Sequence, residues 1–313
     1  MTTLITGGAG MLGSELVRQL LETGGGRPVV MDIADTPDRL ADVAGHIDYV
    51  QGNVGDADAL ANAIEVHKPD RIYHLGAMLG VTCEENPVLA TEINALGSVH
   101  LLEVAKANAV SQVIFASSIT TFGEDIKGPT ITDTTLQRPT TVYGITKLFA
   151  EHMGRLFRAR YGLDFRAIRF PSITGVGLRP GGIINYTSSI IEESIKGNPS
   201  TVIVTPETPS AMVYVKDAAR ALQELAAAPC ADIKSVCYLV DGPHPMPTAQ
   251  EMADMVRAHI PGARIDFDPN ETWKPLIDQL SLPIDDSAAR SEWGWKPTYN
   301  YERTIQEFIR MLR

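Results

Sequence analysis

Over its first 170 residues the chain alternates short apolar segments with longer amphipathic ones, and this alternation constrains the fold more than any other feature. The short segments are rich in β-branched and aromatic residues, which favour strands. We expect strands at 3–6, 28–32, 47–52, 71–75, 112–117 and 165–170. We expect helices at 11–23, 57–67, 92–108 and 141–161. The sequence therefore predicts an α/β fold, with a doubly wound parallel sheet covered by helices on both faces.

The alternation loosens after Pro171, where the segment GVGLRPGG predicts a loop. Further helices are expected at 185–196, 216–228, 248–259 and 301–312, with one strand at 237–240. This pattern predicts a smaller and less regular C-terminal lobe. We expect residues 1–171 to form the sheet domain, which the chain rejoins at about 213–242, and residues 172–212 and 243–313 to form the lobe.

A glycine-rich turn, LITGGAGMLGSEL, links the first expected strand to the first expected helix. Gly8, Gly10 and Gly13 fit one spacing of a nucleotide-binding turn, and Thr6, Gly7, Gly10 and Gly13 fit another. Either way, backbone N–H groups can approach a pyrophosphate at the positive end of a helix. The turn predicts a dinucleotide site in a Rossmann-type sheet. A tight turn that binds nothing is the alternative.

Asp32 ends the second expected strand, nineteen residues after Gly13. A carboxylate at this point can accept hydrogen bonds from the adenosine ribose hydroxyls. Because its charge would repel a 2′-phosphate, the sequence favours NAD over NADP as the cofactor. Arg27 and Arg39 lie nearby in the chain and leave NADP open as an alternative.

Composition and charge argue against several classes of partner. The net charge of −11 argues against nucleic acid and against an anionic membrane surface. No uninterrupted apolar run approaches the ~20 residues that span a bilayer, and the first apolar stretch, TTLIT, lacks the pattern of a signal peptide. Cys83, Cys230 and Cys237 lack metal-ligand spacing. We expect a cytoplasmic protein with reduced thiols and no metal site.

Three more segments follow the glycine turn in order: YHLGA at 73–77, FASSITTFG at 115–123 and YGITK at 143–147. With this ordered set the chain resembles the extended short-chain dehydrogenase/reductase family, of the NAD-dependent epimerase/dehydratase type, over nearly its whole length. The resemblance implies a catalytic Tyr143 and Lys147. It also implies a catalytic hydroxyl five residues before the Gly of the FG pair, which is Ser118, with Ser117 as a second hydrogen-bonding group.

Contacts to the cofactor and the substrate follow from the glycine turn, the sheet edge and the resemblance. The expected NAD-binding residues are Gly7, Gly10, Met11, Leu12, Asp32, Asn53, Val54, Leu75, Gly76, Ala77, Tyr143, Lys147 and Pro171. The expected substrate-binding residues are Ser117, Ser118, Met78, Leu79, Thr82, Tyr143, Arg179 and Tyr186. Core or loop positions that meet no substrate are the alternative for Met78, Leu79, Thr82, Arg179 and Tyr186.

A tyrosine and a lysine one helical turn apart suit the oxidation of an alcohol. The nicotinamide takes the hydride, so the protein needs a base for the proton. A free tyrosine has a pKa of ~10, and we expect the Lys147 ammonium and the positive nicotinamide to lower the pKa of Tyr143. A shift of ~3 units corresponds to roughly 4 kcal/mol. An exposed tyrosine–lysine contact without a function is the alternative for the pair considered alone.

Three segments indicate which of the family's reaction types this chain catalyses. Related dehydratases resemble one another in an Asp-Glu pair after the catalytic hydroxyl, where this chain has Ile119 and Thr120. Nucleotide-sugar enzymes resemble one another in an arginine that binds the diphosphate, but here VTPETPSAMVYVKD has no arginine before Tyr214. The tail PIDDSAARSEWGWKPTY at 283–299 looks like that of the short-chain L-threonine 3-dehydrogenases.

The resemblance therefore implies NAD-dependent oxidation of a small secondary alcohol, with L-threonine as the leading candidate. Threonine dehydrogenases usually carry GGTTDY where this chain has GGIINY at 181–186, and a serine where it has Gly80. Each difference removes a hydroxyl that could bind an amino acid. The alternatives are a sugar or sugar-acid dehydrogenase, an epimerase that retains its NAD, and a protein that only senses the dinucleotide.

Two expectations concern residues outside the site. His74 follows a buried strand and is expected to be a packed core histidine rather than a ligand. Helices 92–108 and 141–161 carry apolar residues that could pack in a two-fold four-helix interface, as in the family's dimers, so we expect a homodimer. Core packing alone is the alternative explanation for these residues.

Overall fold

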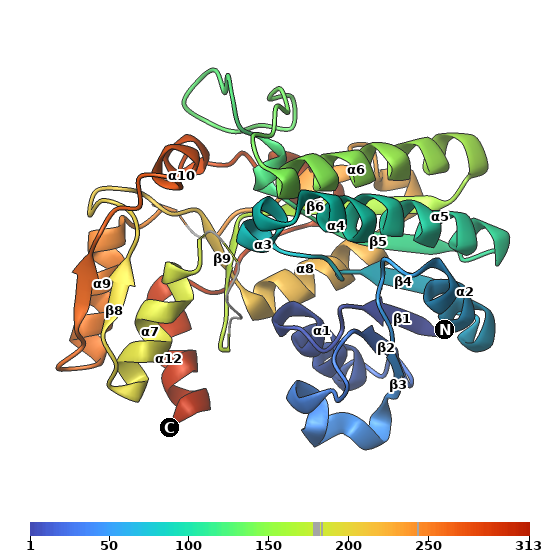
Figure 1. Cartoon of the computed structure of the whole chain (residues 1–313), viewed down its shortest axis with the longest axis horizontal. Helices are drawn as coiled ribbons and strands as arrows, with labels where there is room; N and C mark the ends of the chain where they lie inside the picture. Colours follow the sequence, from blue (N-terminus) through green and yellow to red (C-terminus); the bar gives the residue numbers. More distant parts are fainter. Residues whose placement is uncertain (178–181, 183, 243) are drawn as a thin grey trace.

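We describe a computed structural model of the chain, which covers residues 1–177, 182, 184–242 and 244–313. Its centre is a sheet of seven parallel strands in the order β10-β6-β5-β4-β1-β2-β3 (Figure 1). The strands are β1 (Thr3–Thr6), β2 (Val29–Asp32), β3 (Asp48–Gln51), β4 (Arg71–His74), β5 (Gln112–Ser118), β6 (Asp164–Phe170) and β10 (Cys237–Leu239). The chain builds the sheet in both directions from β1, so the strand order reverses between β1 and β4.

Helices cover both faces of this sheet, which confirms the predicted fold class. Helices α1 (Met11–Glu22) and α8 (Val215–Ala227) pack on one face. Helices α2 (Ala57–His67), α5 (Gly97–Ala107) and α6 (Val142–Tyr161) pack on the other (Figure 1). Strands β1, β2, β5 and β10 are buried on both faces, whereas the edge strand β3 is partly exposed.

The C-terminal lobe has a hydrophobic core of its own. It contains two small parallel sheets, β7 (Ser172–Thr174) with β9 (Met212–Tyr214), and β8 (Ser200–Val202) with β11 (Ile265–Phe267). Its helices are α7 (Tyr186–Lys196), α9 (Ala249–His259), α10 (Lys274–Leu280) and α12 (Tyr301–Leu312). The chain returns to the large sheet through α8 and β10, whereas β9 pairs outside that sheet. Helix α11 (Ser287–Trp293) packs on β10.

The expected helix 92–108 begins earlier than the sequence pattern indicates. Two short helices, α3 (Gly80–Glu85) and α4 (Pro87–Ala90), come first, and a π-helical turn, η2 (Thr91–Leu96), joins α4 to α5. Three short 3₁₀ segments lie elsewhere: η1 (Asp38–His46), η3 (Ile119–Thr121) and η4 (Cys230–Asp232). The extra residue of a π turn shifts the helix face, which a regular 3.6-residue periodicity does not anticipate.

The continuous helical stretch Pro87–Ala107 is long and apolar enough to cross a membrane by length and composition, with a mean hydropathy of 1.2. The stretch is not an uninterrupted apolar run, because it contains Glu92, Glu103 and Lys106. Its most apolar window is 44% buried inside the protein, and it packs beside α2 and α6. A helix that packs in a protein core meets the same criterion, and these contacts join this helix to the helices on one face of the large sheet.

Candidate active site

The glycine turn after β1 and the turn after β4 meet at the carboxyl edge of the sheet. Gly7 has a φ of +68°, and a Cβ atom there would lie 2.6 Å from the backbone nitrogen of Gly76. Gly76 in turn donates its N–H to Thr6 Oγ1 at 3.3 Å. Gly10 is the N-cap of α1 and offers no side chain. The two turns therefore place the N-terminus of α1 at the point where the strand order reverses, where ligands bind in such sheets.

Asp32 lies beside this turn with 8% of its surface exposed. One carboxylate oxygen accepts the backbone N–H of Ala9 at 3.0 Å, and the other accepts that of Ala34 at 3.2 Å. These bonds fix the carboxylate and leave further lone pairs for ribose hydroxyls. A glycine-lined helix N-terminus and a fixed carboxylate one strand away fit a dinucleotide.

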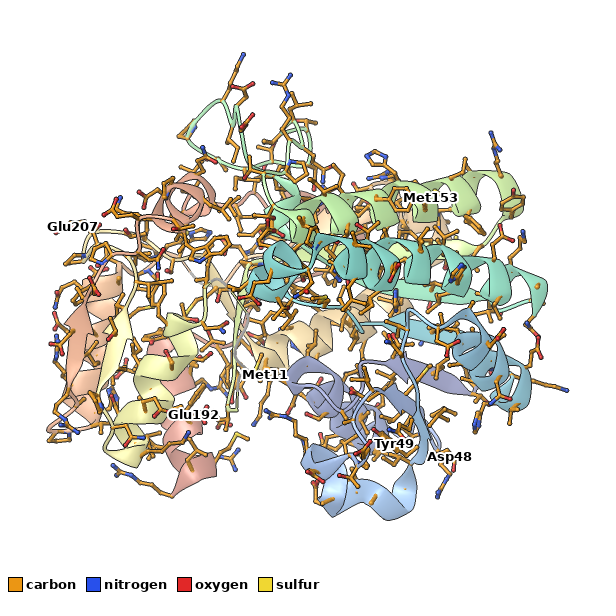
Figure 2. The ribbon with its side chains drawn as sticks, in the orientation of Figure 1. Met11, Asp48, Tyr49, Met153, Glu192 and Glu207 are labelled. Atoms are coloured by element: carbon orange, nitrogen blue, oxygen red, sulfur yellow. The ribbon has the colours of Figure 1, made fainter. Side chains whose placement is uncertain are left out.

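The other expected cofactor residues lie along the same edge. Val54 is buried under Gly76, and Asn53 Oδ1 accepts the N–H of Gly55 at 2.9 Å. Met11 and Leu12 open α1, and Figure 2 labels Met11 where this helix meets the C-terminal lobe. The turn 75–77 follows β4, and Pro171 links β6 to β7. All of these residues therefore flank one edge, although they come from four separate parts of the chain.

Arg39, one of the two arginines that leave NADP open as the cofactor, makes contacts within the protein. Its guanidinium donates to the carbonyl oxygens of Val176, at 3.2 Å, and Gly177. The guanidinium of Arg27 donates to the Asp48 carboxylate and to the carbonyl oxygens of Gly45 and Ile47. Both arginines thus have protein partners in the described residues, and neither contact requires a 2′-phosphate.

Helix α6 brings Tyr143 to the end of β5. Thr141 caps the helix by accepting the N–H of Gly144 at 3.0 Å, and Glu84 accepts the N–H of Val142 at 2.7 Å. These groups satisfy N–H groups that have no partner within the helix. A Cβ atom at Gly144 would lie 2.0 Å from the carbonyl oxygen of Thr120, so only glycine allows this approach.

Lys147 lies one helical turn after Tyr143 and is 3% exposed. Its ammonium donates to the carbonyl oxygen of Ala116 at 2.8 Å and lies 4.6 Å from the ring centre of Phe115. The same nitrogen lies 5.6 Å from the ring centre of Tyr143. The lysine therefore ties α6 to β5 directly before Ser118.

Burial sets the charge states of this pair. It raises the pKa of Tyr143, with a smaller raising effect from Cys83. It lowers the pKa of Lys147 to about 8. The expected lowering of the tyrosine pKa by Lys147 is therefore absent from the protein alone, because desolvation disfavours the charged phenolate.

Ser118 ends β5 with its hydroxyl oxygen in a fixed orientation. This oxygen accepts the N–H of Thr120 at 3.1 Å and the hydroxyl of Thr120 at 2.9 Å. A serine hydroxyl has two acceptor positions and one donor. With both acceptor positions occupied, the proton of Ser118 is left to donate to another oxygen.

Ser117 does not join Ser118, which corrects its expected role as a second substrate hydrogen-bonding group. Successive side chains of a strand point to opposite faces. The hydroxyl of Ser117 is buried and donates to Glu151 Oε1 at 2.6 Å. It therefore belongs to the core between β5 and α6.

The remaining expected substrate residues are dispersed. Met78 and Leu79 precede α3, and Thr82 Oγ1 donates to the carbonyl of Leu79 at 2.7 Å. The hydroxyl of Tyr186 bonds to Ser210 in the core of the C-terminal lobe, and burial raises its pKa to about 12. Tyr186 is thus a buried lobe residue here. Arg179 lies outside the described residues.

Sequence reasoning missed Asn94, which supports the turn after β4. Its side-chain oxygen accepts the N–H of Met78 at 2.8 Å, and its amide nitrogen donates to the Met78 carbonyl at 3.0 Å and to Thr146 at 3.2 Å. Asn94 lies in the π turn η2 and is 4% exposed. A polar residue inside an otherwise apolar helical run was the one signal that could have identified it.

Comparison with known proteins agrees with this geometry. The chain matches the NAD dependent epimerase/dehydratase family over residues 3–237. It is 30% identical over 307 residues to the mitochondrial L-threonine 3-dehydrogenase of Bos taurus, covering 98% of this chain and 81% of the relative.

Two solved structures extend the comparison. An L-threonine dehydrogenase from Cupriavidus necator superimposes with a TM-score of 0.87 at 29% identity, covering 99% of each chain. A monomeric L-threonine 3-dehydrogenase from a metagenome gives 0.88 at 26% identity, covering 99% of this chain and 98% of that one. The chain therefore belongs to the NAD-dependent epimerase/dehydratase family, whose NAD-dependent oxidoreductases act on CH–OH groups.

Proposed function

We propose that this protein is an NAD-dependent dehydrogenase of a small secondary alcohol, with L-threonine as its leading substrate and 2-amino-3-oxobutanoate as the product. One observation supports the proposal: Lys147 donates a hydrogen bond to the carbonyl oxygen of Ala116, which joins the helix that carries Tyr143 to the strand that ends in Ser118. The relatives named L-threonine dehydrogenase support the choice of substrate.

The proposed NAD-binding domain is 1–171, rejoined at about 213–242, and the proposed substrate-binding lobe is 172–212 with 243–313. Within the first, the residues expected from the sequence would hold NAD, and Asp32 would accept hydrogen bonds from the adenosine ribose. Bound NAD supplies a hydride acceptor. Lys147 binds the nicotinamide ribose and carries positive charge beside Tyr143.

Ser118 and Tyr143 act on the alcohol itself. The free proton of Ser118 donates to the substrate oxygen and orients it. Tyr143 accepts the proton of the same hydroxyl as the hydride leaves carbon. Because burial raises the pKa of Tyr143 in the protein alone, the phenolate would need positive charge beside it, which Lys147 and a bound nicotinamide would supply.

A screen of NAD reduction tests the proposal. Absorbance at 340 nm is followed with L-threonine, L-serine, 3-hydroxy acids, aldonates, free aldoses and uronates. We expect L-threonine to give the highest kcat/KM, and Tyr143→Phe to abolish turnover while NADH affinity stays close to wild type. Failure of L-threonine alone removes this substrate, and activity in Tyr143→Phe contradicts the mechanism.

A sugar substrate is the second candidate, because two polar groups of the threonine dehydrogenases are absent. Gly80 is buried at the start of α3 and offers no hydroxyl, and Ile184 stands in the loop before α7. An epimerase of this family would retain NAD on purification and show no net reduction at 340 nm. Reduction with an aldose or a uronate would support a sugar dehydrogenase.

Two further properties are proposed with the function. The exposed apolar residues Val88, Leu89, Leu96, Ile145 and Phe149 lie on the neighbouring helices α4, η2 and α6, and they support a homodimer through this face. One relative is described as monomeric, so the oligomeric state is to be measured.

The three free cysteines support a reducing compartment such as the cytoplasm. Fractionation of the host cell tests this location.

A further inference from the structure

Arg39 joins two segments of the chain that leave the large sheet at distant strands. Arg39 follows β2, which ends at Asp32, and the loop 175–177 follows β6 and β7. In the strand order, β5, β4 and β1 lie between β6 and β2. At about 4.8 Å for each strand spacing, β6 and β2 lie about 19 Å apart. A contact between the two segments therefore spans the carboxyl edge that carries the glycine turn.

The Arg39 guanidinium makes this contact. Its Nη1 donates to the carbonyl oxygen of Val176 at 3.2 Å, and its Nη2 donates to that of Gly177. We call these two bonds the Arg39 bridge. Gly177 has a φ of +71°, and a Cβ atom there would lie 2.6 Å from Nη2. Glycine at position 177 therefore suits both the backbone conformation and the approach of the arginine.

Both ends of the Arg39 bridge are anchored to helices. Arg18 of α1 donates to the backbone carbonyl oxygen of Arg39 and to the Asp42 carboxylate, the latter at 2.9 Å, which fixes the start of η1. On the other side, the N–H of Gly177 donates to Glu192 Oε2 of α7 at 2.7 Å. The bridge therefore connects η1 and α1 to the C-terminal lobe.

The loop 175–177 rests on the first turn of α1. A Cβ atom at Gly175 would lie 2.6 Å from Met11 Sδ, and Met11 directly follows the N-cap Gly10. Figure 2 labels Met11 at the point where α1 meets the lobe. A pyrophosphate at this helix N-terminus would therefore lie between the glycine turn, Asp32 and the Arg39 bridge.

The lobe has other attachments, so the Arg39 bridge can open while the lobe stays in place. Lys216 of α8 pairs with Glu307 of α12 at 2.6 Å, and Asp217 accepts the N–H of Thr298 at 2.7 Å. Arg39 itself is only half-buried, so water can replace the two carbonyl oxygens as acceptors when the bridge opens.

We propose that Arg39 is a positioning residue that holds the loop 175–177 across the cofactor edge, so that NAD and NADH enter and leave when its two bonds open. The inference rests on the proposed binding of NAD at this edge. The same bonds break for entry and for departure. The Arg39 bridge therefore controls the rate of cofactor exchange rather than the affinity for the cofactor.

Stopped-flow fluorescence of NADH with the full chain tests the proposal. Mixing with NADH gives kon, and displacement by excess NAD gives koff. We expect Arg39→Ala to raise both rates about tenfold, the equivalent of about one hydrogen bond, and to change Kd less than about threefold. A residue that bound the cofactor directly would raise koff alone and weaken affinity. That result, or unchanged rates, overturns the proposal.

Two further variants separate the bonds of Arg39 from its charge. Gly177→Ala keeps the arginine, but its Cβ atom would displace the guanidinium, and we expect the same rise in both rates. Arg39→Lys keeps the charge without the planar pair of donors, and we expect faster exchange here too. Wild-type rates in folded Gly177→Ala, or in Arg39→Lys, overturn the proposal.

Arg27→Ala is the matched control. The Arg27 guanidinium also donates to two backbone carbonyl oxygens, but those of Gly45 and Ile47, which lie outside the loop 175–177. We expect NADH rates within about twofold of wild type. Equal acceleration in Arg27→Ala and Arg39→Ala overturns the proposal.

Hydrogen exchange provides a readout that needs no cofactor. The N–H of Gly177 is bonded to Glu192, and we expect the peptide that covers 175–177 to exchange faster in Arg39→Ala but not in Arg27→Ala. Equal exchange in the two variants contradicts the Arg39 bridge. Since neither readout needs turnover, failure of the substrate screen and failure of this inference are distinguishable.

Discussion

His74 shows how burial fixes the charge of a single side chain beside the candidate site. Its Nδ1 lies 2.7 Å from Thr6 Oγ1 and its Nε2 lies 3.2 Å from Ser98 Oγ. Only 3% of the His74 surface is exposed to solvent. Burial lowers its pKa from 6.5 to about 3, with a smaller lowering by Lys147. The prediction of a packed core histidine is confirmed.

The pKa of His74 predicts a pH-dependent loss of stability. Between pH 6.5 and about 3 the unfolded chain binds a proton at this residue and the folded chain does not, so acidification favours unfolding. From pH 7 to pH 5, wild type should lose about 2 kcal/mol more than His74→Gln. Urea unfolding at the two pH values measures the difference, and equal losses would contradict the assigned cause.

Thr120 is predicted to orient the hydroxyl of Ser118. In Thr120→Val the oxygen of Ser118 loses one of its two donors, so its proton is no longer restricted to the substrate. We expect kcat to fall about tenfold, equivalent to one hydrogen bond, with little change in KM. Thr121→Val is the comparison, because that hydroxyl donates to the backbone carbonyl of Ser118 instead. Equal effects of the two variants would argue against an orienting role.

At the scale of elements, the N-terminus of α6 is held by a helix from elsewhere in the chain. Glu84 of α3 accepts the N–H of Val142, at a sequence separation of 58 residues. A carboxylate at this end also interacts favourably with the helix dipole. The contact links the turn after β4 to the helix that carries Tyr143.

Glu84→Ala should therefore destabilise the protein by about 1 kcal/mol, the typical cost of a lost helix cap. The side chain of its neighbour Glu85 is exposed and makes no hydrogen bond or ion pair within the described part of the chain. Glu85→Ala should change stability by less than about 0.5 kcal/mol. Urea unfolding of the two variants makes the comparison, and similar losses would rule out the cap.

The tail shows a second contact between elements that periodicity did not reveal. Asp217 lies in the first turn of α8, where its carboxylate accepts the N–H groups of Thr298 and Tyr299 at 2.7 and 2.9 Å. It also accepts the hydroxyl of Thr298. These bonds fix the irregular segment that follows α11 to the first turn of α8.

At the scale of the whole molecule, the apolar face on α4, η2 and α6 predicts self-association. Phe149 is 42% exposed and Leu96 is 46% exposed on this face. Phe149→Glu places a charge in the proposed interface and should raise the dimer dissociation constant at least about 100-fold. Sedimentation velocity measures the change.

Val66 provides the matched control for this prediction. It is 64% exposed but lies on α2, away from that face. Val66→Glu should leave the dimer intact. A monomeric wild type, or equal dissociation in both variants, would contradict the proposed interface.

Much of the fold could be predicted because its determinants are local. Apolar strands, helical periodicity and the glycine turn each lie within one short segment, and parallel strands bring their carboxyl ends to one edge. The start of the helix at Pro87 was missed because the π turn η2 interrupts the period. The three-residue strands β7, β8, β9 and β11 were missed because so short a run shows no clear alternation, whereas the equally short β10 was predicted from its apolar run CYLV.

The sequence by itself determined the parallel sheet, the family, and the residues that could form a cofactor turn and a Tyr–Lys–Ser site. Only the tertiary structure decided that Ser117 bonds to Glu151, that Thr120 holds Ser118, and that burial raises the pKa of Tyr143 and lowers that of Lys147. The physical reason is that spacing specifies which residues share a face, whereas desolvation and hydrogen-bond partners depend on segments far apart in the chain.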